Sequence, residues 1–282
     1  MSAADALAVR RPRMVSSRFL RSELRLIFRR RRNLAGLLVL AGVTVLISVS
    51  VKLSGVSGGG PDFFSSITDN GLFVALASLT LELGLFLPLA VAVISGDSVA
   101  GEANIGTLRY LLTVPVQRSR MLAVKYAAIV IFSLVATFTV TGTGLVMGLA
   151  LFGGGPMTLL SGTQTSFADG LLRVVAASIY LGLCIASLGA VGLFVSTLTE
   201  QPVAAMIAVV IFSTASFILD TIPQVAWLHP FLITHNWFTF GDLFRDPVAW
   251  HGVVHGTYVA AAYALVFWLA GWARLMAKDI TS

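Results

Sequence analysis

DSVAGEANIGTLRYLLTVPVQRSRMLAVK, residues 97–125, is a polar stretch set between two long apolar runs. It carries six charged residues, although only 11% of the whole chain is charged. It is too polar to cross a bilayer and too short to build a core of its own. Four of its residues have the spacing of one polar helix face: Glu102, Gly106, Arg109 and Thr113. Because Pro115 ends the pattern, the stretch predicts a short amphipathic helix at the membrane surface, with a polar face open to a soluble partner.

The chain around this stretch is strongly apolar. It is 57% hydrophobic, with a mean hydropathy of +0.90, which is typical of a polytopic membrane protein. Six apolar runs are long enough to cross a bilayer as helices. We place them at 34–54, 72–96, 121–151, 171–198, 202–220 and 253–273. The predicted fold is an all-α integral membrane protein with a six-span domain over 33–273.

The basic residues predict the orientation of these spans. If the N-terminus is cytoplasmic, the inner segments are 1–33, 97–125, 199–201 and 274–282, and they hold 16 of the 19 Lys and Arg residues. Cytoplasmic loops carry such an excess of positive charge, so we expect both termini in the cytoplasm and the protein in the cell membrane. No sequence pattern typical of nucleic-acid binding is present.

The first 32 residues divide into two parts. We expect residues 1–15 to form a disordered cytoplasmic tail and residues 16–32 to form a basic amphipathic helix in the membrane interface. Seven arginines would anchor this helix to anionic lipid headgroups: Arg18, Arg21, Arg25, Arg29, Arg30, Arg31 and Arg32. The helix could also border a partner subunit, and both interpretations stay open. The basic region is longer than that of a signal peptide, so we expect the first span to be retained.

Glu82 lies near the middle of the predicted second span, six residues before Pro88. A carboxylate at that depth costs about 2.5–3.5 kcal/mol, so it should face protein or water. One interpretation is a residue that lines a substrate pathway. The other is a protonated or hydrogen-bonded residue that packs between helices.

Residues 221–252 form a predicted outer segment rich in aromatic residues and proline. This composition suits a re-entrant segment in the membrane interface, which could be either a gate over a pathway or an aromatic belt. All four histidines lie in or beside it, and the spacing of His251 and His255 could suit a metal. Without the Glu of an H-E-x-x-H motif, interfacial hydrogen bonding is the better interpretation. We predict no metal site and no catalytic residue.

Rows of small residues at four-residue spacing occur in two spans. The fourth span has Ser178, Gly182, Ala186 and Ala190, and the sixth has Gly252, Gly256, Ala260 and Ala264. Small residues let helix backbones approach closely. Packing inside one copy of the chain and contact with a second copy are both open, and the first is favoured.

The polar stretch has an ordered set of residues beyond its helical spacing. They are Asp97, Glu102, Gly106, Thr107, Leu111, Leu112, Pro115, Arg118 and Lys125. Together with the six spans, this order resembles the ABC type-2 permease family, the membrane subunits of ABC exporters and related transporters. Residues 278–280, Lys-Asp-Ile, also resemble the family's C-terminal ending.

The resemblance implies that residues 102–113 form a coupling helix docked in a cleft of a separate ATP-binding subunit. It implies seven docking residues: Asp97, Glu102, Gly106, Thr107, Arg109, Pro115 and Arg118. ATP and Mg²⁺ would be held by that partner, because this chain has no Walker A motif and we expect no cofactor in it. The turn at residues 200–202 would make a minor inner contact. A second copy of the permease, or a paralogue, would complete the pathway.

The function expected from this resemblance is outward transport of an amphipathic or lipid-like substrate, such as a drug, peptide or lipid. Two alternatives stay open. An integral-membrane enzyme would need acid, base, nucleophile or metal residues at one depth, and the spans offer only Glu82 and Asp220. A secondary transporter would show internal repeats, discontinuous spans and several buried charges.

Overall fold

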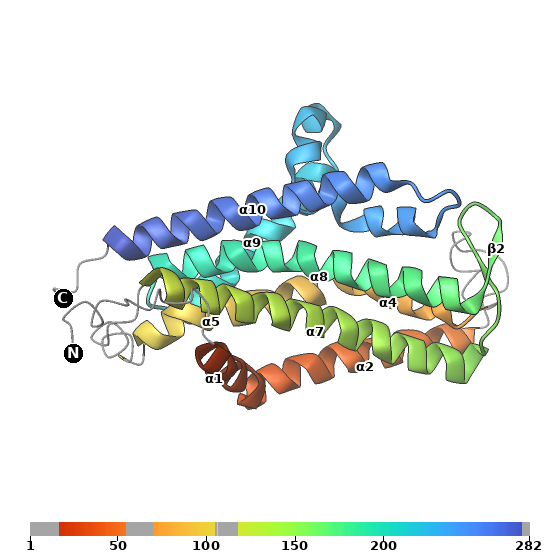
Figure 1. Cartoon of the computed structure of the whole chain (residues 1–282), viewed down its shortest axis with the longest axis horizontal. Helices are drawn as coiled ribbons and strands as arrows, with labels where there is room; N and C mark the ends of the chain where they lie inside the picture. Colours follow the sequence, from red (N-terminus) through yellow and green to blue (C-terminus); the bar gives the residue numbers. More distant parts are fainter. Residues whose placement is uncertain (1–16, 55–69, 105, 107–117, 278–282) are drawn as a thin grey trace, which may run out of the picture.

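The computed structural model describes residues 17–54, 70–104, 106 and 118–277. The helices lie alongside one another in an elongated bundle (Figure 1). The longest are α2 (Arg31–Ser54), α5 (Phe86–Asn104), α7 (Arg118–Phe152), α8 (Phe167–Leu198), α9 (Pro202–Asp220) and α10 (Trp250–Ala277). Within the described residues, these six are long and apolar enough to cross a membrane. The predicted all-helical fold with six candidate spans is therefore confirmed.

The second predicted span is interrupted, and the prediction of one helix over 72–96 was wrong. Helix α4 (Leu72–Leu83) ends before a turn at Gly84 and Leu85, and α5 begins at Phe86. Pro88 has no N–H to donate to the carbonyl group of Gly84, so the helical ladder cannot run through this point. The second half continues to Asn104, well beyond the predicted end.

Helix α8 occupies the middle of the bundle and is mostly buried. In Figure 1, α10 runs along one flank and α2 along the opposite one. The small residues of α8 pack inside this copy: an added Cβ at Gly182 would lie 3.3 Å from Leu134 Cα of α7, and Ser178 Oγ lies 2.7 Å from Thr141 Oγ1. On α10, Gly252 meets Thr239 in the same way. These contacts support packing within one copy, and contact with a second copy stays a prediction.

The N-terminal helix is shorter than predicted. Helix α1 covers Ser17–Arg29, whereas Arg31 and Arg32 already belong to α2, so the predicted helix over 16–32 is divided at Arg30. Asn33 stabilises the corner, since its Nδ2 donates to the carbonyl oxygen of Ile27 at 2.9 Å. We call the end of the bundle that contains α1, the last turn of α5 and the first turn of α7 the α1 end (Figure 1).

The opposite end carries a small hairpin, and two short helices lie between α9 and α10. Strands β1 (Met157–Thr158) and β2 (Gln164–Thr165) pair antiparallel, with Met157 opposite Thr165. Residues predicted as a re-entrant segment form two 3-10 helices, η2 (Pro223–Phe231) and η3 (His235–Phe244). The part between α9 and η3 stands out from the flank of the bundle (Figure 1).

The aromatic residues of this outer segment fall into two groups, so neither predicted interpretation covers them all. Trp237 and Phe244 are 1% exposed and belong to the core, whereas Trp227 and Phe231 of η2 are 73% and 63% exposed. The first pair anchors η3 to the bundle. The second pair is free to contact lipid or a partner.

Candidate functional site

The described members of the predicted docking set, Asp97, Glu102, Gly106 and Arg118, lie at the α1 end, but they do not share one helix. Asp97 and Glu102 are part of α5, which ends at Asn104. Gly106 has a φ of 72°, a left-handed conformation that ends a right-handed helix. The described part of the predicted face therefore leaves the helix at Gly106, and the predicted docking helix from there to Thr113 stays a prediction. Thr107, Arg109 and Pro115 lie outside the described residues.

Arg118, the first residue of α7, joins this helix to the end of α10. Its Nη1 donates to the carbonyl oxygens of Leu275 at 2.8 Å and Met276 at 3.2 Å. The last carbonyl groups of a helix have no partner within it, so an arginine there satisfies them and complements the helix dipole. Within the described residues, Arg118 thus has a structural contact in addition to its predicted docking role.

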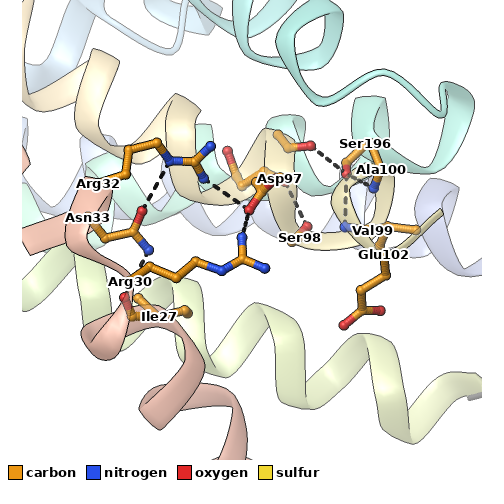
Figure 2. A network of polar contacts seen from close by, with 12 residues as sticks. Ile27, Arg30, Arg32, Asn33, Asp97, Ser98, Val99, Ala100, Glu102 and Ser196 are labelled. Atoms are coloured by element: carbon orange, nitrogen blue, oxygen red, sulfur yellow. Dashed lines mark hydrogen bonds and ion pairs between the residues drawn. The ribbon is translucent and has the colours of Figure 1, made fainter. Parts of the chain in front are cut away.

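Asp97 connects α5 to the corner between α1 and α2. Its Oδ2 accepts hydrogen bonds from Arg30 Nη1 and from Arg32 Nη2, the latter at 3.0 Å (Figure 2). Arg30 and Arg32 were predicted as lipid anchors together with five other arginines. All seven arginines are exposed, and what sets Arg30 and Arg32 apart is their contact with a carboxylate of the same chain.

Lys125 of α7 is the most deeply buried charge at this end, with 3% exposure. Its Nζ lies 2.5 Å from Glu102 Oε1 on α5 and 3.2 Å from Glu23 Oε1 on α1. One ammonium group therefore holds carboxylates from two other helices. We call Glu23, Glu102 and Lys125 the buried triad.

Ser196 of α8 is inserted into the backbone of α5. Its Oγ accepts hydrogen bonds from the N–H groups of Val99 at 3.0 Å and Ala100 at 2.8 Å, and donates to the carbonyl oxygen of Gly96 at 2.8 Å (Figure 2). A side chain that replaces bonds of the helical ladder fixes the two helices to each other. Helix α5 is thus held by α8 on one side and by the buried triad on another.

Sequence reasoning missed three residues of this site: Glu23, Asn33 and Ser196. Glu23 had a signal, because it is the only acidic residue of α1 and lies four residues from Phe19 and Ile27, on the inward face of the helix. Ser196 had no such signal in the sequence, because a serine near the end of an apolar helix is usually a packing residue. Its role depends on the position of another helix.

The contacts at this end leave little empty space among the helices. The cavity beside Glu23, Asp97 and Lys125 has a volume of about 50 Å³, which is room for a few water molecules. Segment 105–117 leaves α5 just after Glu102 and returns to α7 just before Lys125. The two helices at the ends of that segment, α5 and α7, are therefore joined by the ion pair between Glu102 and Lys125.

Two further predicted groups lie elsewhere. Glu82 is fully buried within one copy, where Thr44 Oγ1 donates to its Oε1 at 2.7 Å. This burial favours the packing interpretation, because a residue that lines a pathway between two copies would be exposed in one of them. Near η2, His235 Nδ1 lies 2.6 Å from Asp220 Oδ1, and His255 Nε2 lies 3.3 Å from the carbonyl oxygen of Pro230. His229, His235 and His255 thus each make a hydrogen bond, which agrees with the expectation for His255 of the predicted pair.

Comparisons with known proteins identify a family and one relative. A family model described as a protein of unknown function (DUF2705) matches residues 38–281. The probable ABC transporter permease protein NosY of Pseudomonas aeruginosa is 30% identical over 115 residues, which are 41% of this chain and 40% of NosY. The similarity thus spans less than half of that relative.

Proposed function

The chain belongs to the DUF2705 family of proteins of unknown function, and we propose that it is the membrane-spanning permease subunit of an ABC transporter. In this proposal, a separate ATP-binding subunit binds ATP and Mg²⁺ and supplies the energy. The similarity to a probable ABC transporter permease and the six candidate spans support the permease class.

The observation that carries the proposal is the set of contacts made by the residues on either side of segment 105–117. At one side of the segment, Glu102 contacts Lys125, and Lys125 contacts Glu23 of α1. At the other side, Arg118 contacts the end of α10. A displacement of the segment by a partner would move α1, α5, α7 and α10 together. Rigid-body movement of packed helices is a common means of switching between two conformations.

The substrate in this proposal is amphipathic or lipid-like, and its direction of transport is outward. Within the described residues, each candidate span has a long stretch with at most two charged side chains, which favours an apolar molecule over a highly charged one. Most of α9 and α10 is not buried inside one copy. These helices therefore offer surface for lipid, for a second permease copy and for a pathway between two copies.

Copurification tests the proposal. Tagged wild-type protein, extracted in mild detergent from its native cells, should bring down an ATP-binding subunit. The double variant Thr107→Ala/Arg109→Ala should remain folded and lose most of that subunit, because both residues lie in the predicted docking segment. These two substitutions are preferable to a substitution of Glu102, because that would also remove an ion-pair partner of Lys125.

The matched control is Arg245→Ala, which removes an exposed arginine at the far end of the bundle. It should retain the partner. Full retention by the double variant would remove the docking assignment, and the absence of any ATPase from the wild-type preparation would contradict the permease proposal. ATPase activity of the complex, measured with amphipathic compounds and phospholipids, would then identify the substrate class.

A further inference from the structure

A buried carboxyl group lies where the second span is interrupted. Glu82 is in the last turn of α4, and its side chain is fully buried. Its Oε1 accepts from Thr44, whereas its Oε2 has no hydrogen-bond partner in the part of the chain that the structure describes. In transporters, broken membrane helices form sites for Na⁺ or protons, because the ends of the half-helices leave polar groups inside the membrane.

A second unpartnered polar atom lies one helical turn away. Ser78 is also fully buried, and its Oγ has no hydrogen-bond partner among the described residues. Ser78 and Glu82 are four residues apart on α4, so their side chains are neighbours on one helix face. A membrane interior does not leave two polar atoms unsatisfied without cost, so this pair marks a place for an additional proton or water molecule.

Helix α7 packs against the face of α4 that carries this pair. The backbones approach closely where Gly71 meets Gly148 and where Ala75 meets Gly144. Two buried threonines, Thr141 and Thr137, follow on α7, but their hydroxyl groups face α8. Thr141 Oγ1 lies 2.7 Å from Ser178 Oγ, and Thr137 Oγ1 would lie 3.1 Å from a Cβ added at Gly182.

The polar neighbours of Glu82 are therefore hydroxyl groups: Thr44 of α2 donates to its Oε1, and Ser78 lies one turn away on α4. In the described part of α5 and α8, no side chain makes a hydrogen bond or ion pair with Glu82. Since an isolated carboxylate is far more costly to bury than a neutral acid, this packing favours the protonated form.

We propose that Glu82 is a proton-binding site inside the membrane domain. It holds a proton while α2, α4 and α7 are packed as in this structure, and it releases the proton when the break at Gly84 and Leu85 opens to water. Uptake transfers a proton from hydronium to the carboxylate, which forms one O–H bond at Oε2 and leaves a water molecule. Release is the reverse. While the proton is held, Ser78 Oγ can accept a hydrogen bond from the new O–H group, directly or through a water molecule.

Infrared spectroscopy tests this site on the full-length protein in lipid nanodiscs. The wild type should show the C=O stretching band of a protonated carboxyl group, and the band should disappear as the pH is raised. Glu82→Gln should lack it at every pH, whereas Asp246→Asn, which removes an exposed carboxyl group near the hairpin, should retain it. The thermal unfolding midpoint of the wild type should fall relative to that of Glu82→Gln as pH rises, because ionisation places a charge in apolar surroundings.

Each other outcome contradicts the proposal. Identical spectra for wild type and Glu82→Gln would show that Glu82 carries no proton. A band that persists at every pH at which the protein is folded would make Glu82 a fixed packing group. If Glu82→Gln does not fold, the variants Thr44→Val and Ser78→Ala are measured in its place. Both should shift the C=O band, because each removes a hydroxyl group next to Glu82. An unshifted band would belong to another carboxyl group and would contradict the proposal. No ATP-binding subunit is needed, so the result is independent of the proposed transport function.

Discussion

Lys125 places an ammonium group between the carboxylates of Glu23 and Glu102, with 3% of its surface exposed. A buried ion pair gains little net stability, because the attraction is offset by the loss of hydration. Removal of one partner is much more costly, since the remaining charges stay buried without compensation. The buried triad should therefore be sensitive to single substitutions, although it contributes little as an intact unit.

Lys125→Met should lower the free energy of unfolding by about 3–5 kcal/mol, because it leaves two neighbouring carboxylates without their cation. The measurement is thermal or denaturant unfolding of the purified protein in detergent. Lys52→Met is a matched control, since Lys52 is exposed and donates to the carbonyl oxygen of Leu151 at the other end of the bundle. Equal effects of the two variants would show that the triad has no special role.

Asp97→Asn should have a smaller effect, of about 0–1 kcal/mol. Its partners Arg30 and Arg32 are 45% and 50% exposed, so water solvates them well when the carboxylate is removed. The same unfolding measurement checks this value. A loss as large as that of Lys125→Met would mean that the arginine contacts are far more important than their exposure indicates.

At the scale of elements, α4 and α7 are held by the close approach of their backbones. The paired glycines, Gly71 and Gly148, leave no room for a Cβ atom at either position. At Gly144, an added Cβ would lie 2.7 Å from the Cα of Ala75. Close contact of this kind is the main source of attraction between helices in lipid, where burial of apolar surface gives no advantage.

Gly148→Ala should destabilise the protein by about 1–3 kcal/mol, because the added methyl group forces α4 and α7 apart. Gly142→Ala on the same helix should be neutral or stabilising by up to about 1 kcal/mol, since alanine has the higher helix propensity. An added Cβ at Gly142 has no atom within 4 Å. Unfolding of both variants in the same detergent compares them. Equal stability would contradict the packing seen here.

At the scale of the whole molecule, the distribution of charge predicts which end faces the cytoplasm. The α1 end carries the arginines of α1 and α2, and the hairpin end lies opposite (Figure 1). The positive-inside rule places the α1 end in the cytoplasm. The proposed docking role depends on this orientation, because an ATP-binding subunit can reach only the cytoplasmic side.

Cysteine labelling of intact cells tests the orientation. Cys184 is the only cysteine and is buried, so Cys184→Ala gives a suitable background. In it, Leu160→Cys at the hairpin end should react with a membrane-impermeant maleimide, because Leu160 is 50% exposed. Asn104→Cys at the α1 end should react only after the cells are permeabilised. The reverse pattern would place the docking segment outside the cell and contradict the permease proposal.

The sequence by itself determined that the protein is helical, that six of its helices can cross a membrane, and roughly where five of them lie; the second is displaced to Phe86–Asn104. These are local properties, because the length of an apolar run and the position of prolines and charges do not depend on other helices. The interruption at Gly84 and Leu85 could have been predicted as well, because Pro88 has no N–H to donate to the carbonyl group of Gly84. At Gly106 the backbone adopts a left-handed conformation, which the helical spacing of Glu102 and Gly106 did not predict, and the rest of the predicted docking helix lies outside the described residues.

Only the tertiary structure decided which polar groups meet. The contact of Lys125 with Glu23 joins residues 102 positions apart, and that of Thr44 with Glu82 joins residues 38 positions apart. Helical periodicity shows which residues share a face, but it does not show which face of another helix lies opposite. The physical reason is that burial and pairing of a charge depend on the packing of several helices at once, and that packing also decided that Glu82 lies inside one copy.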